Sequence, residues 1–277
     1  MIHSASRASL AELQQRLEAV TGRFSTADGL IGLAQEVHAV AQLLAAQPRL
    51  RRTLSDASTP AEWRTGLASQ LLGGKVGAST VQAVGDAVSL RWSSQWDLVD
   101  ALELVAADAL FVAAENAGVL DQIEDELFRF ERILDGRSEL AVLLDEATVN
   151  PQRRIQLLDA LVADKVHPIT AELLRNAISS RRKHTVRLAI DDLLAAAAKR
   201  RNRSVAKVMS AVPLSAEQED RLTAALSESY HRPISVRTAI DPAVRGGLVV
   251  RIGDEIIDGS VAARLLQART ALTGRNP

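Results

Sequence analysis

The residues that could support catalysis are few, and their spacing does not suit it. Gly73-Gly74-Lys75 has the composition of a phosphate-binding loop, but such a loop needs a glycine five positions before its final glycine and a hydroxyl residue after the lysine. Ser69 and Val76 occupy those two positions. We therefore interpret the three residues as the end of a helix followed by a turn, and we expect no phosphate site.

The sequence also lacks the usual ligands and nucleophiles of catalytic sites. The five histidines (positions 3, 38, 167, 184 and 231) are dispersed, and no two are separated by four residues, the spacing with which one helix face binds zinc. The absence of Cys excludes thiolate ligands, disulfides and Cys nucleophiles. The sequence shows no Ser-His-Asp or Gly-x-Ser-x-Gly arrangement. We expect no catalytic residue, no metal and no cofactor.

The remaining titratable residues are expected to be structural or solvated. His38 lies in an otherwise apolar stretch and is predicted to be partly buried or at a boundary. Asp121, Asp125 and Glu126 are predicted to lie on exposed helix faces, where carboxylates remain solvated.

Two basic clusters, RRKH at 181–184 and KRRNR at 199–203, could bind nucleic acid or an acidic protein. The chain carries 33 basic and 34 acidic residues, a net charge of −1, and only 3% aromatic residues. Neither the overall charge nor the small number of aromatic side chains, on which bases stack, favours the binding of nucleic acid. We expect no nucleic acid as a partner and interpret the clusters as solvated helix ends, although the second could meet an acidic protein.

Composition predicts a soluble protein of two or more modules. The chain has 277 residues, 47% hydrophobic and 24% charged, which is ordinary for a globular protein of about two domains. No stretch approaches about 18 uninterrupted apolar residues, and the N-terminus lacks the apolar core of a signal peptide. We expect no transmembrane segment.

Apolar spacing predicts helices over most of the first two hundred residues. The clearest stripe has steps of 3, 4, 3 and 4 and consists of Leu120, Ile123, Leu127, Phe130 and Leu134. Three helix starts are signalled by an N-cap Thr59 before Pro60, by Asn150 before Pro151, and by the capping-box pair Ser215 and Gln218.

The helical region repeats itself. When residues 37–91 are shifted by ninety positions without a gap, 13 of the 55 aligned pairs are identical, against roughly five expected by chance in so Ala- and Leu-rich a chain. Examples are Leu44 with Leu134 and Thr80 with Thr170. The alternative is two unrelated amphipathic bundles with a common period, but unrelated bundles have no reason to keep equal loop lengths. We predict two helical bundles of about six helices each, at 1–97 and 98–202.

The last part of the chain, 203–277, is predicted to be a small α+β domain, which makes the fold class mainly α. Alternating apolar residues indicate strands, and Gly253-Asp254 is a two-residue hairpin turn. The expected elements are strands at 205–212, 234–240, 247–252 and 255–258, a helix at about 215–230 and a last helix at 260–272.

At this point the chain resembles a known family. The segments IDPAVRGGLVVRIGD at 240–254 and IDGSV at 257–261 are similar to the C-terminal signature of the delta subunit of bacterial F-type ATP synthase, which is called the oligomycin-sensitivity-conferring protein in mitochondria. SAVPLS at 210–215 and DALF at 108–111 also resemble family segments. The resemblance covers about 104–272, so residues 1–97 are expected to be an extra copy of the family's helical bundle.

Physical reasons account for much of this signature. Paired glycines allow the chain to turn and to approach a neighbouring strand closely, and Asp-Pro starts a turn. A Gly-Ser pair can end a hairpin and cap a helix. We interpret the signature as structural, with a contact surface as the alternative; its residues are Asp241, Pro242, Gly246, Gly247, Gly253, Asp258, Gly259 and Ser260.

The resemblance implies a non-catalytic subunit of the peripheral stalk, at the cytoplasmic side of the cell membrane. It implies that the family bundle binds the N-termini of ATP synthase α subunits between its first and fifth helices, at about 99–116 and 168–181, and that the C-terminal domain binds the C-termini of b subunits. The candidate groove residues are Ala107, Phe111, Leu174, Ala177 and Ile178. Periodicity cannot separate a groove wall from a core, so these five residues could also be core.

Other readings of the sequence remain open. A stand-alone α-helical adaptor would have the same bundles, and a nucleic-acid-binding regulator would use the basic clusters. The sequence does not decide which bundle binds the α subunit.

Overall fold

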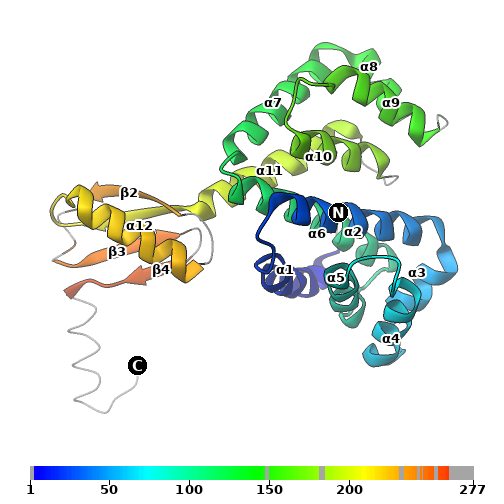
Figure 1. The fold of residues 1–277 in the computed structure, drawn as a ribbon, viewed down its shortest axis with the longest axis horizontal. Helices are drawn as coiled ribbons and strands as arrows, with labels where there is room; N and C mark the ends of the chain where they lie inside the picture. Colours follow the sequence, from blue (N-terminus) through cyan, green and yellow to red (C-terminus); the bar gives the residue numbers. More distant parts are fainter. Residues whose placement is uncertain are drawn as a thin grey trace. The chain divides into compact units, whose positions relative to one another are not determined.

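The computed structural model describes residues 3–146, 150–180, 185–230, 234–241, 244, 246–252 and 255–261. The chain forms two compact units, Met1–Ala195 and Ala196–Pro277. The first is helical, and the second combines a sheet with a helix (Figure 1). The expected mainly α fold with a small α+β domain is confirmed, whereas the division at 97/98 and 202/203 stays a prediction.

The helical unit is built from short elements joined by short loops. They are η1 (Ser4–Ser6), α1 (Arg7–Thr21), α2 (Ala27–Ala46), α3 (Pro48–Ser55), α4 (Ala61–Leu72), α5 (Ala78–Ser89), α6 (Gln95–Asn116), α7 (Leu120–Gly136), α8 (Ser138–Asp145), α9 (Pro151–Val162), α10 (Pro168–Ser179) and α11 (Val186–Ser204), the last of which runs into the second unit. The predicted stripe on α7 is confirmed, because all five of its apolar residues are buried.

Two of the three predicted helix starts are confirmed. The side chain of Asn150 accepts a hydrogen bond from the N–H of Gln152 (3.0 Å), and Ser215 and Gln218 exchange bonds in a capping box. The prediction for Thr59 is wrong: α4 has Pro60 as its N-cap residue, with no side-chain cap. The backbone carbonyl of Thr59 instead accepts a hydrogen bond from the Arg64 guanidinium.

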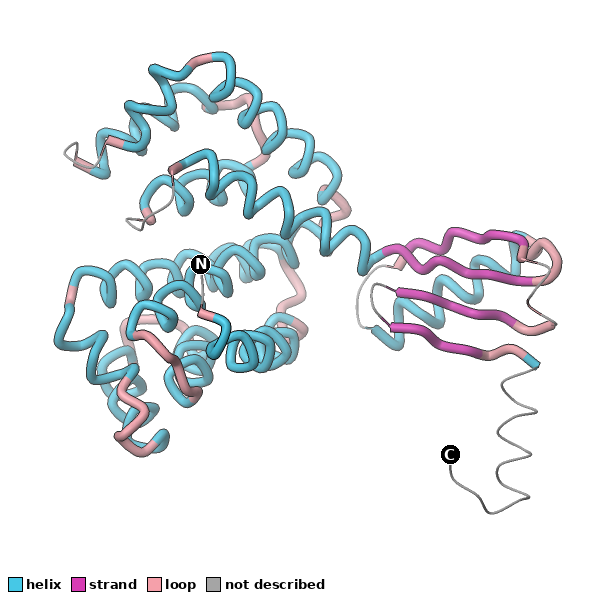
Figure 2. The backbone as a smooth tube through the Cα atoms, turned by 180° about the vertical axis from the view of Figure 1, so that it is seen from behind, coloured by secondary structure: helices cyan, strands magenta, loops and turns pink. Residues whose placement is uncertain are grey.

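The positions of the helices support the predicted duplication. Shifted by ninety residues, α3, α4 and α5 coincide with α8, α9 and α10 at both ends. When α6 is moved back by ninety residues it overlaps α1, and when it is moved forward by ninety residues it overlaps α11. We call α1 to α6 the first copy and α6 to α11 the second copy; α6 belongs to both, and the predicted boundary at 97/98 falls inside it. Figure 2 shows the helices as cyan segments joined by loops, and Figure 1 labels them in order.

Helix α2 is the one described helix that is long and apolar enough, by length and composition alone, to cross a membrane. Its apolar residues Leu30, Ala34 and Val37 are completely buried, and its contact with α6 is the most extensive helix–helix contact of the described residues. The apolar character of α2 is thus accounted for by packing inside the helical unit.

The second unit contains a four-stranded sheet with one helix on one face. The strands are β1 (Val205–Ser210), β2 (Ser235–Ile240), β3 (Leu248–Ile252) and β4 (Glu255–Asp258), and the helix is α12 (Ala216–Tyr230). The sheet order is β2-β1-β3-β4, with β1 and β2 parallel and the other pairs antiparallel. Its core is formed by Ala206, Val208, Leu226, Ile234, Val250 and Ile252.

The predicted hairpin is confirmed by the register of its strands. Ile252 pairs with Glu255, which leaves two residues for the turn. Gly253 itself lies outside the described residues, as does the predicted last helix beyond Val261.

Candidate functional site

The predicted partner groove lies between α6 and α10, and these helices are in contact. Phe111 and Leu174 are 0% exposed and Ile178 is 1% exposed, whereas Ala107 and Ala177 are half-buried. Three of the five side chains therefore belong to the core of the second copy, and a partner would reach them only if α6 and α10 moved apart. The role of the five residues in binding a partner stays a prediction.

A carboxylate from α7 holds the start of α10. Glu126 Oε2 accepts hydrogen bonds from the backbone N–H of His167 (2.8 Å) and from the hydroxyl of Thr170 (2.5 Å). His167 is the N-cap residue of α10, so the anion lies at the positive end of the helix dipole. The prediction that Glu126 lies on an exposed face is wrong, because its carboxylate turns into this site and is buried. Burial opposes its ionisation, but hydrogen bonds from Thr170, Gln122 and His167 lower the pKa of Glu126 below its ordinary value.

The first copy repeats this arrangement ninety residues earlier. Glu36 Oε2 on α2 accepts hydrogen bonds from the N–H of Gly77 (2.9 Å) and the hydroxyl of Thr80 (2.5 Å), and Gly77 is the N-cap residue of α5. The sequence analysis did not predict that these two glutamates bind the starts of the fifth helices, although the repeat contains a signal for it. Extending the repeat alignment by one residue at its start places Glu36 on Glu126.

A buried arginine is duplicated in the same way. The guanidinium of Arg64 donates to the carbonyl of Leu54, and that of Arg154 donates to the carbonyl of Leu144 (3.1 Å). Both residues are buried and satisfy carbonyls at the end of the third helix of their copy, which would otherwise lack partners. The two copies therefore share these two hydrogen-bond arrangements as well as their helix positions.

We expect Glu126→Ala to lower the free energy of unfolding by about 2 kcal/mol, because it leaves the buried Thr170 hydroxyl and the His167 N–H without their acceptor. Glu36→Ala should cost less, since the N–H of Gly77 is exposed to water. Because the folded pKa of Glu126 is lowered, its contribution is present above about pH 4.5 and is lost as the pH falls through the folded value. Urea unfolding at several pH values measures both effects; equal losses in the two variants would contradict the prediction.

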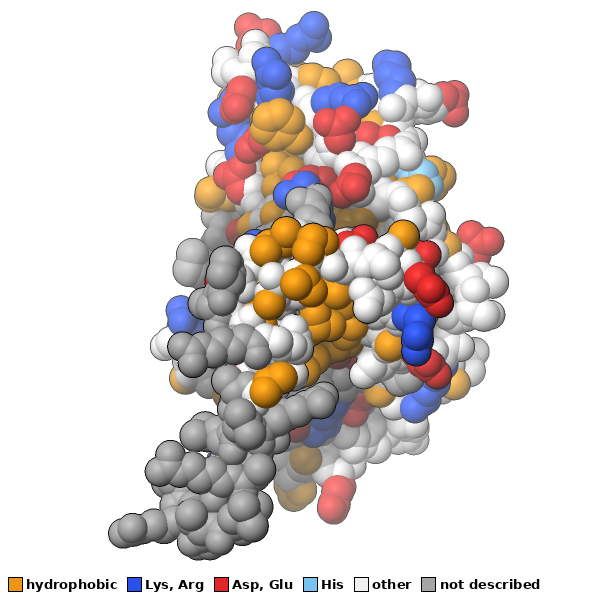
Figure 3. Space-filling model, turned by 90° about the vertical axis from the view of Figure 1, so that its left-hand side faces the viewer, with side chains coloured by type: hydrophobic (Ala, Val, Ile, Leu, Met, Phe, Trp, Pro, Cys, Tyr) orange, Lys and Arg blue, Asp and Glu red, His pale blue; other side chains and the backbone are white. Residues whose placement is uncertain are grey.

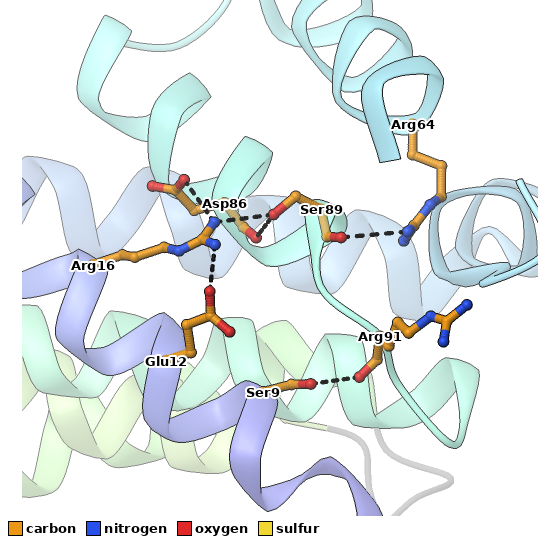
Figure 4. A network of polar contacts seen from close by, with 7 residues as sticks. All are labelled: Ser9, Glu12, Arg16, Arg64, Asp86, Ser89 and Arg91. Atoms are coloured by element: carbon orange, nitrogen blue, oxygen red, sulfur yellow. Dashed lines mark hydrogen bonds and ion pairs between the residues drawn. The ribbon is translucent and has the colours of Figure 1, made fainter. Parts of the chain in front are cut away.

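The copies differ on the outer side of their first and fifth helices. In the first copy a polar network joins α1 and α5 (Figure 4). Arg16 contacts Glu12 (2.5 Å), Asp86 (3.4 Å) and the hydroxyl of Ser89 (3.1 Å). The side chains of Glu12 and Arg16 are 50% and 38% exposed, so this network faces solvent. We call these four residues the outer seam of the first copy.

The outer seam of the second copy, ninety residues later, is Leu102, Ala106, Asn176 and Ser179. Leu102 and Ala106 are 0% exposed, and they lie on α6, along which α2 of the first copy packs. His38 Nε2 on α2 forms a 2.8 Å hydrogen bond with Ser179 Oγ. Ser179 is the counterpart of Ser89, whose hydroxyl contacts Arg16 in the first copy. His38 is therefore buried at a boundary, as predicted.

His38 and Glu103, on the two helices α2 and α6, have perturbed pKa values. Burial lowers the pKa of His38 to about 4. Burial raises the pKa of Glu103 on α6 to about 7, against a hydrogen bond with Ser180 that lowers it. Burial therefore disfavours the charged form of both side chains.

In the second unit, the signature glycines make a close backbone contact. Gly247 has φ +80°, and a Cβ there would lie 2.4 Å from the carbonyl oxygen of Gly259. The Gly259 N–H donates to the carbonyl of Leu248 (2.9 Å), and the Val261 N–H donates to that of Gly246 (3.0 Å), which has φ +91°. These bonds tie the start of β3 to the segment after β4, as expected of paired glycines.

The other described signature residues make local bonds. The N–H of Asp241 donates to the carbonyl of Ser210 (2.9 Å) and so joins the ends of β1 and β2. Asp258 Oδ1 accepts from the N–H of Ser260 (2.9 Å), and the hydrogen bonds from Ser260 lower the pKa of Asp258. Pro242 lies outside the described residues.

The end of the sheet near the signature also exposes hydrophobic side chains. Val212, two residues after β1, and Ile240, the last residue of β2, are 65% and 60% exposed, and Val261 is also exposed. Figure 3 shows hydrophobic side chains gathered on the face of this unit toward the viewer. Exposed apolar side chains grouped in this way are typical of an interaction site.

The other candidate sites of the sequence are placed as follows. Gly73 ends α4 and Gly74 has φ +73°, which confirms a helix end and turn in place of a phosphate loop. Among the described residues, no group of three or more His, Asp or Glu could hold a metal. The first basic cluster, 181–184, lies outside the described residues, and the second lies in the last turns of α11.

Comparisons with known proteins place this architecture in a family. The family model for the ATP synthase delta (OSCP) subunit matches residues 106–272. The ATP synthase subunit delta of Streptomyces griseus subsp. griseus is 41% identical over 273 residues, 99% of this chain and 100% of that protein. The protein of the same name from Parafrankia sp. (strain EAN1pec) is 39% identical over 278 residues, 98% of this chain and 100% of that protein.

A chain in the structure of the Toxoplasma gondii mitochondrial ATP synthase hexamer is 27% identical, with a TM-score of 0.29, and the match covers 62% of this chain and 96% of that one. The two bacterial relatives match along nearly the whole chain, including the first copy. The chain therefore belongs to the ATP synthase delta (OSCP) subunit family.

Proposed function

We propose that the chain is a non-catalytic subunit of the peripheral stalk of an F-type ATP synthase, at the cytoplasmic side of the membrane. The helical unit binds N-terminal segments of α subunits, and the second unit binds the C-termini of b subunits. The chain thereby keeps the catalytic head from turning with the rotor, so that rotor torque is used in ATP synthesis.

The observation that supports this function most directly is the match over the full length to proteins named ATP synthase subunit delta. It favours a stalk subunit over a stand-alone adaptor. The division into two units adds a physical reason, because a chain that links two partners gains from the effective concentration of its second contact.

The exposed end of the sheet is the surface that we assign to the b subunits. Val212 and Ile240 project there into solvent, and an amphipathic helix end would cover them with its apolar face. Covering two such side chains removes apolar area from water and stabilises the complex.

The test is co-purification of the full chain with ATP synthase α and b subunits. We expect the wild-type chain to retain both, and Ile240→Glu to lose b at least tenfold while retaining α. Val142→Glu on α8, at an equally exposed apolar position of the helical unit, is the matched control and should retain b. If the wild-type chain retained neither subunit, the proposed function would be contradicted. If Ile240→Glu retained b, only the assignment of this surface to the b subunits would be contradicted.

A further inference from the structure

A buried polar contact joins the two copies at the junction of α2 and α10. His38 Nε2 on α2 lies 2.8 Å from Ser179 Oγ on α10, and His38 is 9% exposed. Ser179 donates its one hydroxyl proton to the carbonyl of Asn176 (3.1 Å). Its oxygen therefore accepts from His38, which places the ring proton on Nε2 and leaves Nδ1 as an acceptor. Burial lowers the pKa of His38 to about 4, which favours this neutral ring.

Three side-chain nitrogens at this junction are buried without a hydrogen-bond partner among the described residues. They are His38 Nδ1, Gln42 Nε2 and Asn176 Nδ2. Gln42 follows His38 by four residues on α2, and Asn176 precedes Ser179 by three residues on α10. Residues at these spacings share one face of a helix. The junction thus carries an acceptor and two amide donors within about one helical turn of the His38–Ser179 bond.

The chemistry of these three atoms defines the ligand that would pair them. Buried polar groups in native proteins are almost always paired, by protein groups or by ordered water. An anion would meet the lone pair of His38 Nδ1, and a cation would meet the two amide N–H groups, so a neutral ligand that both donates and accepts is required. Water is the smallest such ligand, and an internal water typically makes about three hydrogen bonds to groups of this kind.

The first copy shows that the equivalent positions of its fifth helix have a polar partner. The counterparts of Asn176 and Ser179, ninety residues earlier, are both contacted by Arg16, at 3.4 and 3.1 Å. Ala106 takes the place of Arg16 in the second copy, and its methyl group forms no hydrogen bond. His38 from α2 replaces the arginine as the partner of Ser179, but the amide nitrogen of Asn176 gains no such replacement from the described residues.

We propose that an ordered water molecule binds at the junction of α2 and α10 and bridges the two copies. It accepts hydrogen bonds from Gln42 Nε2 and Asn176 Nδ2 and donates one to His38 Nδ1. Buried polar networks are rigid when every member is paired, so the water and the His38–Ser179 bond together hold the copies to each other beside the shared helix α6. The site is independent of the partners assigned above.

The test counts the long-lived internal waters of the full chain by magnetic relaxation dispersion of the water oxygen nucleus. Asn176→Leu, which keeps the shape of the side chain and removes its amide, should lose one such water relative to the wild type. Gln42→Met should lose the same water, so the double variant should also lose one. Gln156→Met is the matched control and should lose none, because Gln156 is an exposed glutamine on α9.

Thermal unfolding gives an independent readout with opposite signs for the two cases. If a water pairs the amides, Asn176→Leu and Gln42→Met should each lower the unfolding midpoint. If the amides are buried without any partner, the same substitutions remove a desolvated polar group and raise the midpoint. A raised midpoint would therefore overturn the proposal.

A high-resolution crystal structure of the wild-type chain keeps the test independent of how the variants fold. We expect one water oxygen within hydrogen-bond distance of all three nitrogens. Direct contacts among the three side chains in place of that oxygen would overturn the proposal. Equal water counts in the wild type and both single variants, or two waters lost in the double variant, would also overturn it.

Discussion

Gly247→Val is expected to disrupt the second unit and to cost more than about 3 kcal/mol of its stability. The residue has φ +80°, which a β-branched side chain rarely adopts, and its Cβ would lie 2.4 Å from the carbonyl oxygen of Gly259 and 2.9 Å from the Cα of Ser260. Left-handed backbone strain costs about 1–3 kcal/mol, and forced packing adds about 1–3 kcal/mol. Because the opposing atoms are backbone, no side-chain rotation relieves the clash.

The change should be confined to the second unit. Hydrogen exchange of β3 amides should accelerate strongly in Gly247→Val, while amides of α6 and α10 exchange as in the wild type. Gly66→Val is the control, since Gly66 lies in α4 with open space around an added Cβ; it should change stability by less than about 1 kcal/mol. A thermal unfolding curve of Gly247→Val that overlays that of the wild type would refute the prediction.

Features set by local sequence could be predicted. The stripe on α7 and the capping box at Ser215 depend on residues within one or two turns, so pattern and capping chemistry suffice to find them. The hairpin of β3 and β4 is specified by its two-residue turn. The duplication was detectable because equal loop lengths keep the two copies in register.

Features that depend on distant partners could not be predicted from pattern alone. Glu126 has the spacing of a surface carboxylate, yet its partners His167 and Thr170 lie more than forty residues away. Thr59 resembles an N-cap residue, but a buried arginine takes its carbonyl. For Glu126 a tertiary hydrogen bond decided the outcome over a local preference, whereas for Thr59 the helix begins one residue later, with Pro60 as its N-cap residue.

The candidate groove shows a third limit. Phe111, Leu174 and Ile178 were selected as the facing residues of two neighbouring helices, and all three are buried on helices that contact each other. A stripe of this kind predicts that two helices pack, but it does not reveal whether a third helix covers their outer side. Helix α6 belongs to both copies, so its neighbours come from two bundles, and the apolar spacing of one helix does not show this.

Ala106→Arg is expected to destabilise the helical unit by more than about 3 kcal/mol. The position corresponds to Arg16 in the first copy, where the same side chain is native. At Arg16 the guanidinium has Glu12 and Asp86 as partners and faces solvent. At Ala106, which is 0% exposed, the guanidinium would be forced into the core, where the cost of overpacking and the cost of a buried unpaired charge would add.

The reverse substitution is the control for this asymmetry. Arg16→Ala removes only solvent-exposed ion pairs, which typically contribute about 0.2–1 kcal/mol. Urea unfolding of the two variants therefore measures what covers each seam. A small loss for Ala106→Arg would mean that the outer seam of the second copy can open to admit a charged side chain, against the complete burial of Ala106. A large loss for Ala106→Arg beside a small loss for Arg16→Ala would show that the same helix pair has a buried outer seam in the second copy and a solvent-exposed outer seam in the first.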